Sequence, residues 1–484
     1  KVYKIVLFDC VAKDLEIQIA MIFDQQSILE YLSLYVMFIS SHYYLKYYEA
    51  SILSLNELCI KSASVAIRNA DITCFLPLLT HGQFLQNIPS MLESIPFQRI
   101  LSQRKNKFDN AIVVSAGPSL AKQLSLLKAY QDKAVIFCAD GALSMLEKEG
   151  IVPDYVTNLD FTDLAMKFFQ NKENLKQSII ALECATHPNI VRSLNAENCM
   201  IVLRNKALYQ RFNLNDFGYI DTGTHVSHFS YTLALALGFK NIIMIGQDLA
   251  FDEEGNSHSK GFDFGEKFSG EENIDKLKVP AYAGKGEVLT HITWNDYRIK
   301  LEYLFACNDQ KAKFYNATEG GARINFTEEL SFKECCEKLL TKEKPQFELP
   351  KSLTKNRSDK LLVKFKEKIQ KDQENAKRFL DDALALKQIL ENILSKDFLL
   401  PLEFLEKVYQ NIENFNHSLD TDEFIQDETL RGAFAYRGKM IADVLKLHIQ
   451  DETHFITAYI KAYHEWLLYF IEKLEQKYKS LSKV

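Results

Sequence analysis

The feature that most constrains the fold is an alternation of short apolar runs with helix-like segments, which begins at residue 107. The apolar runs are AIVVSA, KAVIFCAD, DYVTNLD, SIIALECAT, CMIVLRN and NIIMIGQDLAF, and the segments between them include SLAKQLSLLKAY and SHFSYTLALALG. Strands that alternate with helices predict parallel pairing, and strands that are apolar throughout predict cover on both faces. We therefore expect an α/β fold with a central, Rossmann-like, mostly parallel sheet.

The 484 residues are too many for one ordinary domain, so we expect several. Residues 1–105 mix strand-like runs such as VYKIVLF with helical patterns, which predicts an α/β N-terminal domain. Residues 106–330 form the predicted central domain. Residues 341–360 contain two prolines and many charges, as a linker does. Residues 361–484 have a long helical pattern and predict an all-α C-terminal domain.

Composition excludes several classes of protein. The net charge of −6 argues against a protein that coats nucleic acid. No run approaches the ~18 apolar residues of a membrane span, and acidic residues near the start do not fit a signal peptide. The chain begins with Lys1, as a trimmed fragment would. Nine cysteines, without a CxxC pair, indicate reduced thiols and no zinc site. We expect a cytoplasmic protein.

Polar or glycine-containing clusters follow nearly every predicted strand. They are Ser115–Ser119, Asp140-Gly141, Asn158-Leu159-Asp160, Glu183 with Thr186 and His187, Asp221–His225, Gly246-Gln247-Asp248 and Asn316–Gly321. Each has an ordinary structural explanation as a turn or a helix cap. Because ligands of parallel α/β sheets bind at the carboxyl ends of the strands, the clusters together predict a ligand site. A glycine-rich insert, residues 252–291, is long enough to act as a lid.

The turn Gly117-Pro118-Ser119-Leu120 lies where a strand gives way to a helix. The unpaired N–H groups of a helix start bind anions, phosphate above all. The alternative is a tight turn capped by Ser119. The stretch lacks both the GxGxxG glycines and the P-loop lysine. Asp140, Asp160 and Asp248 would bind ribose hydroxyls, a metal ion or a base edge, and the residues leave that choice open.

The motifs SAGPSL, ADGA, PDYVTNLD, DTGTHVSH, IIMIGQDLAF, HSKG and NATEGGA occur in this order. The series resembles the central domain of the motility accessory factor (Maf) family, which are bacterial flagellin glycosyltransferases, over residues 105–325. It is also similar to an archaeal pterin pyrophosphokinase and, through the GPSL turn, to bacterial sialyltransferases. The resemblance implies transfer of a nonulosonic acid, pseudaminic or legionaminic acid, from its CMP-activated form to Ser or Thr of flagellin, as motility requires.

The resemblance also implies roles for individual residues. Those expected to bind the nucleotide-sugar are Gly117, Pro118, Ser119, Leu120, Asp140, Gly141, Asn158, Thr222, Gly223, Gln247 and Asp248. The candidates for the catalytic base are Asp160, His258 and Glu319. Thr224-His225 departs from the glycine or serine expected after DTG, which leaves His225 and His228 without an implied role.

In the mechanism that we expect, the helix start at 117–120 stabilises the phosphate of the leaving CMP, and a base activates the acceptor hydroxyl. We expect that no cofactor is required, and the sequence leaves open whether magnesium takes part. Two alternatives remain. One is a pterin-type pyrophosphokinase that uses ATP and magnesium, and the other is a non-catalytic protein that docks flagellin. The long helical C-terminal region suits a protein acceptor better than a small-molecule kinase.

Overall fold

The structure is a computed structural model, and it describes residues 19, 42–69, 73–170, 173–268 and 275–482. The chain divides into two compact units, one of residues 1–85 with 366–484 and one of residues 86–365. We predicted boundaries near 105 and 360 instead. Both divisions of the structure fall inside long helices, α5 (Phe75–Glu93) and α15 (Lys355–Leu394). Helical periodicity shows that helices form, but not which helices pack together.

A sheet of nine strands forms the centre of the second unit, and its strand order is β11-β10-β7-β1-β2-β3-β4-β5-β6. Every neighbouring pair in it is parallel. The strands are β1 (Asn110–Val114), β2 (Val135–Ala139), β3 (Tyr155–Asn158), β4 (Ile179–Glu183), β5 (Cys199–Arg204), β6 (Tyr219–Ile220), β7 (Asn241–Ile245), β10 (Lys313–Asn316) and β11 (Glu328–Glu329). The predicted parallel sheet is confirmed.

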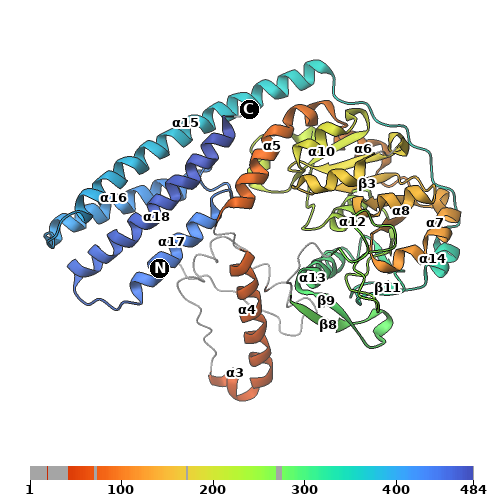
Figure 1. Cartoon of the computed structure of the whole chain (residues 1–484), viewed down its shortest axis with the longest axis horizontal. Helices are drawn as coiled ribbons and strands as arrows, with labels where there is room; N and C mark the ends of the chain where they lie inside the picture. Colours follow the sequence, from red (N-terminus) through yellow and green to blue (C-terminus); the bar gives the residue numbers. More distant parts are fainter. Residues whose placement is uncertain (1–18, 20–41, 70–72, 171–172, 269–274, 483–484) are drawn as a thin grey trace. The chain divides into compact units, whose positions relative to one another are not determined.

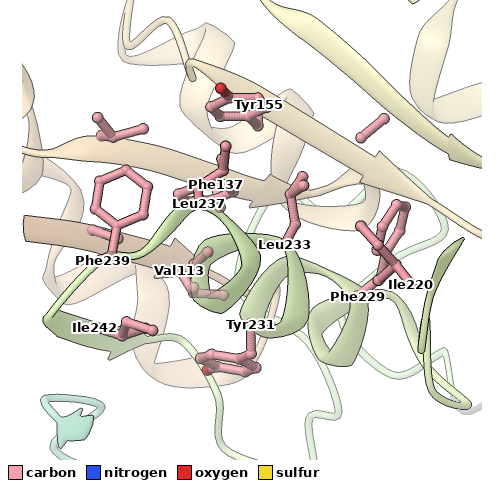
Figure 2. Close-up of a cluster of buried hydrophobic side chains, with 14 of the residues drawn as sticks. Val113, Phe137, Tyr155, Ile220, Phe229, Tyr231, Leu233, Leu237, Phe239 and Ile242 are labelled. Atoms are coloured by element: carbon pink, nitrogen blue, oxygen red, sulfur yellow. The ribbon is translucent and has the colours of Figure 1, made fainter. Parts of the chain in front are cut away.

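The helices of this unit pack around the sheet (Figure 1). They are α6 (Phe97–Arg104), α7 (Leu124–Tyr130), α8 (Leu143–Lys148), α9 (Met166–Phe169), α10 (Pro188–Ser193), α11 (Ala207–Gln210), α12 (Val226–Leu237), α13 (Ile292–Ala306) and α14 (Phe332–Leu339). Helix α12 is buried along most of its length, and its Phe229, Leu233 and Leu237 join the core beneath the sheet (Figure 2). In that core Phe137 stacks on Tyr155 at a centroid distance of 4.7 Å.

The glycine-rich insert contains more regular structure than we predicted. It forms an antiparallel hairpin of β8 (Lys276–Pro280) and β9 (Glu287–His291), which runs directly into α13. In β8 the apolar residues Leu277 and Val279 alternate with lysines, but this alternation covers only two apolar positions, which is too short to mark a strand in the sequence. The helix and the strand that we predicted after the insert are present as α13 and β10.

The N-terminal prediction is only partly within the described residues. The strand-like run VYKIVLF lies outside them. The described residues before 105 form the helices α3 (His42–Tyr47), α4 (Glu49–Asn69), α5 and α6, and no strand is assigned among them. Residues 341–354 have neither helix nor strand, as expected of a linker, and α15 begins at Lys355, inside the predicted linker.

The C-terminal half of the other unit is helical, as predicted. Helix α15 is followed by α16 (Leu402–Thr421), α17 (Arg431–Leu445) and α18 (Glu452–Leu481), which lie side by side (Figure 1). Trp466 and Tyr463 on α18 are fully buried in this bundle, and the Trp466 indole donates a hydrogen bond to the Ala433 carbonyl. None of the helices in the described part of the chain has the length and hydropathy needed to span a bilayer.

Candidate active site

A cavity of about 320 Å³ opens at the carboxyl ends of β1, β2, β3 and β7. Strand β1 lies between β7 and β2, so the strand order changes direction there, and such switch points are where open α/β sheets bind ligands. The cavity is lined by Ser115, Ala116, Gly117, Ala139, Asp140, Gly141, Asp160, Leu164, Ala165, Phe168, His225, Val226, Ser227, Gly246, Gln247, Asp248, Leu249, Ala250, Ser257, His258, Phe262, Phe264, Phe268, Trp294 and Tyr297.

The structure brings together only part of the predicted site. Gly117, Asp140, Gly141, Asp160, Gln247, Asp248 and His258 line the cavity. Pro118, Ser119, Leu120, Asn158, Thr222, Gly223 and Glu319 lie outside its lining. Glu319 accepts a hydrogen bond from the backbone N–H of Phe332 (2.8 Å), which directs its carboxylate to the first residue of α14. Glu319 is therefore not placed to act as the base in this cavity.

The turn at 117–120 does not present free N–H groups to a ligand, contrary to our expectation. The backbone N–H of Ser119 lies 3.3 Å from both carboxylate oxygens of Asp248, and its hydroxyl donates to one of them at 2.8 Å. The N–H of Ala121 donates to the Ser259 hydroxyl. The carboxylate of Asp248 thus occupies the helix start where we placed a phosphate.

Glycine is required where β7 leads into the cavity. Gly246 has a positive φ of 64°, and a Cβ there would lie 2.2 Å from the Ser115 carbonyl oxygen. The backbone N–H of Gly117 donates to the Gly246 carbonyl at 2.8 Å. This close approach of β7 to the turn after β1 fixes Gln247 and Asp248 at the cavity wall.

Two aspartates form the wall at the ends of β2 and β3. Asp140 receives hydrogen bonds from the Gly141 N–H (2.7 Å) and from the Asn158 side-chain amide (2.5 Å). Asn158 is fully buried and its other amide atom accepts from the Asp160 N–H, so Asn158 holds this wall from behind. Thr162 donates to one Asp160 oxygen through both its N–H and its hydroxyl, which leaves the second oxygen for a ligand.

Burial changes the charge state of these carboxyl groups. It raises the pKa of Asp140 to about 7, although the Asn158 hydrogen bond opposes the change. The negative charge of Asp160 adds to the increase. Burial also raises the pKa of Asp248 to about 6, against the opposing effect of the Ser119 hydrogen bonds. Near neutral pH Asp140 therefore exists in both protonation states.

Aromatic residues form the wall on the side of the insert, and the sequence gave no sign that they would gather. Phe168, Phe262, Phe264, Phe268 and Trp294 meet there around His258. The His258 ring stacks on Phe262 with a centroid distance of 3.9 Å and an angle of 8°. Phe262, Phe264 and Phe268 come from the part of the insert before its hairpin, whereas Phe168 belongs to α9 and Trp294 to α13, so no regular spacing in the sequence relates them.

His258 is placed to accept a proton. The Ser257 hydroxyl lies 2.9 Å from His258 Nδ1 and also within 2.9 and 2.6 Å of the carbonyl oxygens of Glu266 and Phe268. Because the hydroxyl donates its proton to a carbonyl, its oxygen accepts from Nδ1–H, and Nε2 keeps its lone pair. Burial lowers the pKa of His258 to about 4, so the ring is neutral at physiological pH.

Gln247 presents donors to the cavity. Its side-chain oxygen accepts from the Ser115 hydroxyl (2.8 Å) and from the Tyr231 hydroxyl (3.3 Å). These two contacts orient the amide so that its NH₂ group faces away from them. Ser115 also lies 2.9 Å from the Ser227 hydroxyl at the start of α12.

The start of α12 completes the cavity; we predicted that the cluster Asp221–His225 lies at the site but expected no role for His225 itself. His225 is the N-cap, and its Nδ1 accepts from the His228 N–H. The backbone N–H groups of Val226 and Ser227 have no acceptor among the described residues. Thr222 and Gly223, which we expected at the ligand, lie just before this helix start in the chain and outside the cavity lining. A Cβ on Gly223 would meet the His228 ring at 2.3 Å.

The walls of the cavity therefore differ in chemistry. Helix α12 and Gln247 supply hydrogen-bond donors, Asp140 and Asp160 supply acceptors, and the insert supplies flat apolar surface. The lining contains no lysine or arginine among the described residues. In the same part of the chain, no group of three His, Cys, Asp or Glu side chains is arranged to hold a metal ion.

Two comparisons with known proteins found similarities to this chain. Residues 82–254 match the family model described as 6-hydroxymethylpterin diphosphokinase MptE-like. The solved structure of MAf glycosyltransferase from Magnetospirillum magneticum AMB-1 superposes with a TM-score of 0.58 at 16% identity, over 97% of this chain and 70% of that one. The chain has the fold of a Maf glycosyltransferase. No curated protein sequence matches it. The resemblance found in the motifs is thus confirmed for the fold.

Proposed function

We propose that the chain is a glycosyltransferase that moves a nonulosonic acid, of the pseudaminic or legionaminic type, from its CMP-activated form to Ser or Thr hydroxyls of flagellin. The observation that carries the proposal is the division of the cavity into a donor wall, an acceptor wall and an aromatic wall. A CMP-sugar has the matching parts, which are a phosphate and a carboxylate, several hydroxyls and a flat base. The likeness of the whole fold to a Maf glycosyltransferase supports the same proposal.

The proposed reaction breaks the bond between the anomeric carbon of the sugar and the phosphate oxygen, and the electron pair leaves with CMP. The N–H groups of Val226 and Ser227 and the Gln247 amide stabilise the growing charge on the phosphate. The free oxygen of Asp160 stabilises positive charge on the sugar ring. The acceptor hydroxyl attacks the anomeric carbon and gives its proton to Nε2 of His258.

The second candidate is a diphosphokinase that acts on a pterin-like alcohol. The family model that matches residues 82–254 is described as that of a diphosphokinase, which favours this candidate. The cavity argues against it, because the triphosphate of ATP would meet Asp140, Asp160 and Asp248 without a basic side chain in the described lining. A magnesium ion would have to offset that repulsion.

Thermal unfolding with a panel of ligands separates the two candidates. A ligand present at a hundred times its Kd stabilises the protein by about 2.7 kcal/mol. We expect CMP and CMP-N-acetylneuraminic acid to raise the Tm in the presence of EDTA. The increase with the CMP-sugar should be smaller in Asp160→Ala and unchanged in Asp109→Ala, a surface carboxylate paired with Lys240. Stabilisation by ATP with magnesium alone would favour the kinase, and stabilisation by none of them would contradict a nucleotide site.

The affinity for the CMP-sugar should fall as the pH rises from about 6 to about 8. An anionic ligand favours the protonated form of Asp140, whose pKa is about 7, and that form is lost as the pH rises through this value. The phosphodiester and carboxylate of the ligand do not titrate in this range. Calorimetric titration at several pH values should show that Asp140→Asn removes the change above pH 7. Equal pH dependence in the two proteins would contradict this role of Asp140.

A further inference from the structure

His225 is a polar residue of the cavity wall that the proposed reaction does not use. Its Nδ1 accepts the His228 N–H at 3.3 Å, which makes it the N-cap of α12. A neutral imidazole that accepts at one nitrogen carries its proton on the other. The proton of His225 therefore sits on Nε2.

Nε2 of His225 is buried and has no hydrogen-bond partner among the residues that the structure describes. A buried donor without an acceptor costs free energy, so native structures rarely retain one without a reason. The ring is held in place because it stacks on Tyr297 of α13, with a centroid distance of 4.7 Å and an angle of 28°. It also lines the cavity beside the first N–H groups of α12.

We propose that His225 is a specificity-determining residue that binds an oxyanion of the CMP-sugar through its neutral Nε2–H. The inference rests on the proposed function, because it takes the CMP-sugar as the ligand. The oxyanion is the phosphate or the sugar carboxylate, which share this chemistry. Together with the Val226 and Ser227 N–H groups, His225 gives the donor wall a third kind of donor, without adding a charge.

The surroundings keep the ring neutral. Burial lowers the pKa of His225 well below its usual value, and the nearby His228 and Lys300 act in the same direction. The charged or titratable groups around the ring are His228 on its own helix and Tyr297 and Lys300 on α13, with Lys300 also near Thr224. A neutral donor binds an anion equally well at pH values below and above the ordinary histidine pKa. An imidazolium would lose its charge, and with it part of the affinity, as the pH rises through that value.

The test compares His225→Asn with the wild type. Asparagine is a good N-cap and keeps the hydrogen bond from His228, but its short amide does not reach the place of Nε2. His187→Asn is the matched control. His187 also caps a helix, α10, through Nδ1, and it does not line the cavity. Calorimetric titration with CMP, CMP-N-acetylneuraminic acid and ATP, with and without magnesium, measures the Kd of each protein.

We expect His225→Asn to weaken binding by about tenfold to a hundredfold, the usual effect of losing a hydrogen bond to a charged group. His187→Asn should bind as the wild type does. Equal weakening for CMP and the CMP-sugar places the ring at the phosphate, and weakening for the CMP-sugar alone places it at the carboxylate. The ratio of the Kd of His225→Asn to the Kd of the wild type should stay constant between about pH 5.5 and pH 8, since the ring is neutral throughout.

Other outcomes would overturn the proposal. A His225→Asn protein that binds every ligand as the wild type does would exclude an oxyanion contact. A Kd ratio that collapses above about pH 6.5 would show an imidazolium instead. If the wild type binds ATP and not CMP, the proposed function fails, and loss of ATP binding in His225→Asn would still support the contact. If the wild type binds none of the ligands, both fail.

Discussion

Replacing His258 with glutamine is expected to lower kcat for sugar transfer by about a hundredfold to ten-thousandfold, the usual contribution of a general base. The Kd for CMP should change little, because the proton that His258 accepts comes from the acceptor hydroxyl. The neutral ring, with its proton on Nδ1 at the Ser257 hydroxyl, is the structural reason for this expectation. The measurement is the single-turnover rate of transfer at saturating donor.

Two further results would strengthen or remove this role of His258. Imidazole added to His258→Ala should restore part of the rate, which a purely structural defect would not allow. The wild-type rate should stay level as the pH falls from about 7 to about 5 and decline near pH 4, where the ring becomes protonated. A His258→Gln rate within a few-fold of the wild type would eliminate His258 as the base and leave Asp160 as the remaining candidate.

Replacing Gly246 with alanine should destabilise the α/β unit by about 3 kcal/mol. A positive φ costs an alanine roughly 1–2 kcal/mol, and a Cβ 2.2 Å from the Ser115 carbonyl oxygen forces a backbone shift that costs about 1–3 kcal/mol more. Urea unfolding measures the change. Because Gln247 and Asp248 follow directly in the chain, the same substitution should abolish CMP binding.

Gly255→Ala is the matched control for Gly246→Ala. Gly255 also has a positive φ, 78°, but a Cβ there meets no described atom within 4 Å. Only the backbone strain remains, so the loss should be about 1 kcal/mol. If the two variants lost equal stability, the close approach of β7 to the turn after β1 would not be the reason that glycine stands at 246.

The sequence was sufficient to predict the architecture of the sheet. The runs AIVVSA and NIIMIGQDLAF became β1 and β7, because a strand covered on both faces must be apolar throughout and that pattern is local. Hairpin β8–β9 escaped prediction because its buried positions are too few to form a pattern. The grouping of residues 1–85 with 366–484 also escaped, since helix periodicity carries no information on distant partners.

The location of the site could be predicted, but the roles of its residues could not. Polar clusters follow the predicted strands, and this pattern predicted Asp140, Asp160 and Gln247 at one edge of the sheet. In the structure all three line the cavity at that edge. The contact of Asp248 with Ser119 depends on the register between β1 and β7, which no local pattern encodes. The role of His225 could not be predicted for a similar reason. Whether the second nitrogen of a capping histidine faces a cavity depends on where the helix packs in the fold.

The most direct test of the proposed function is the intact mass of flagellin after incubation with this protein and a CMP-nonulosonic acid in EDTA. We expect the flagellin mass to increase by whole nonulosonic acid residues, on Ser or Thr. We expect no increase without the protein and, over the same incubation time, a far smaller increase with His258→Gln. Unmodified flagellin, under conditions in which the protein binds the CMP-sugar, would contradict transfer to this acceptor. Transfer of a diphosphate from ATP to a pterin alcohol would replace the proposal with the kinase.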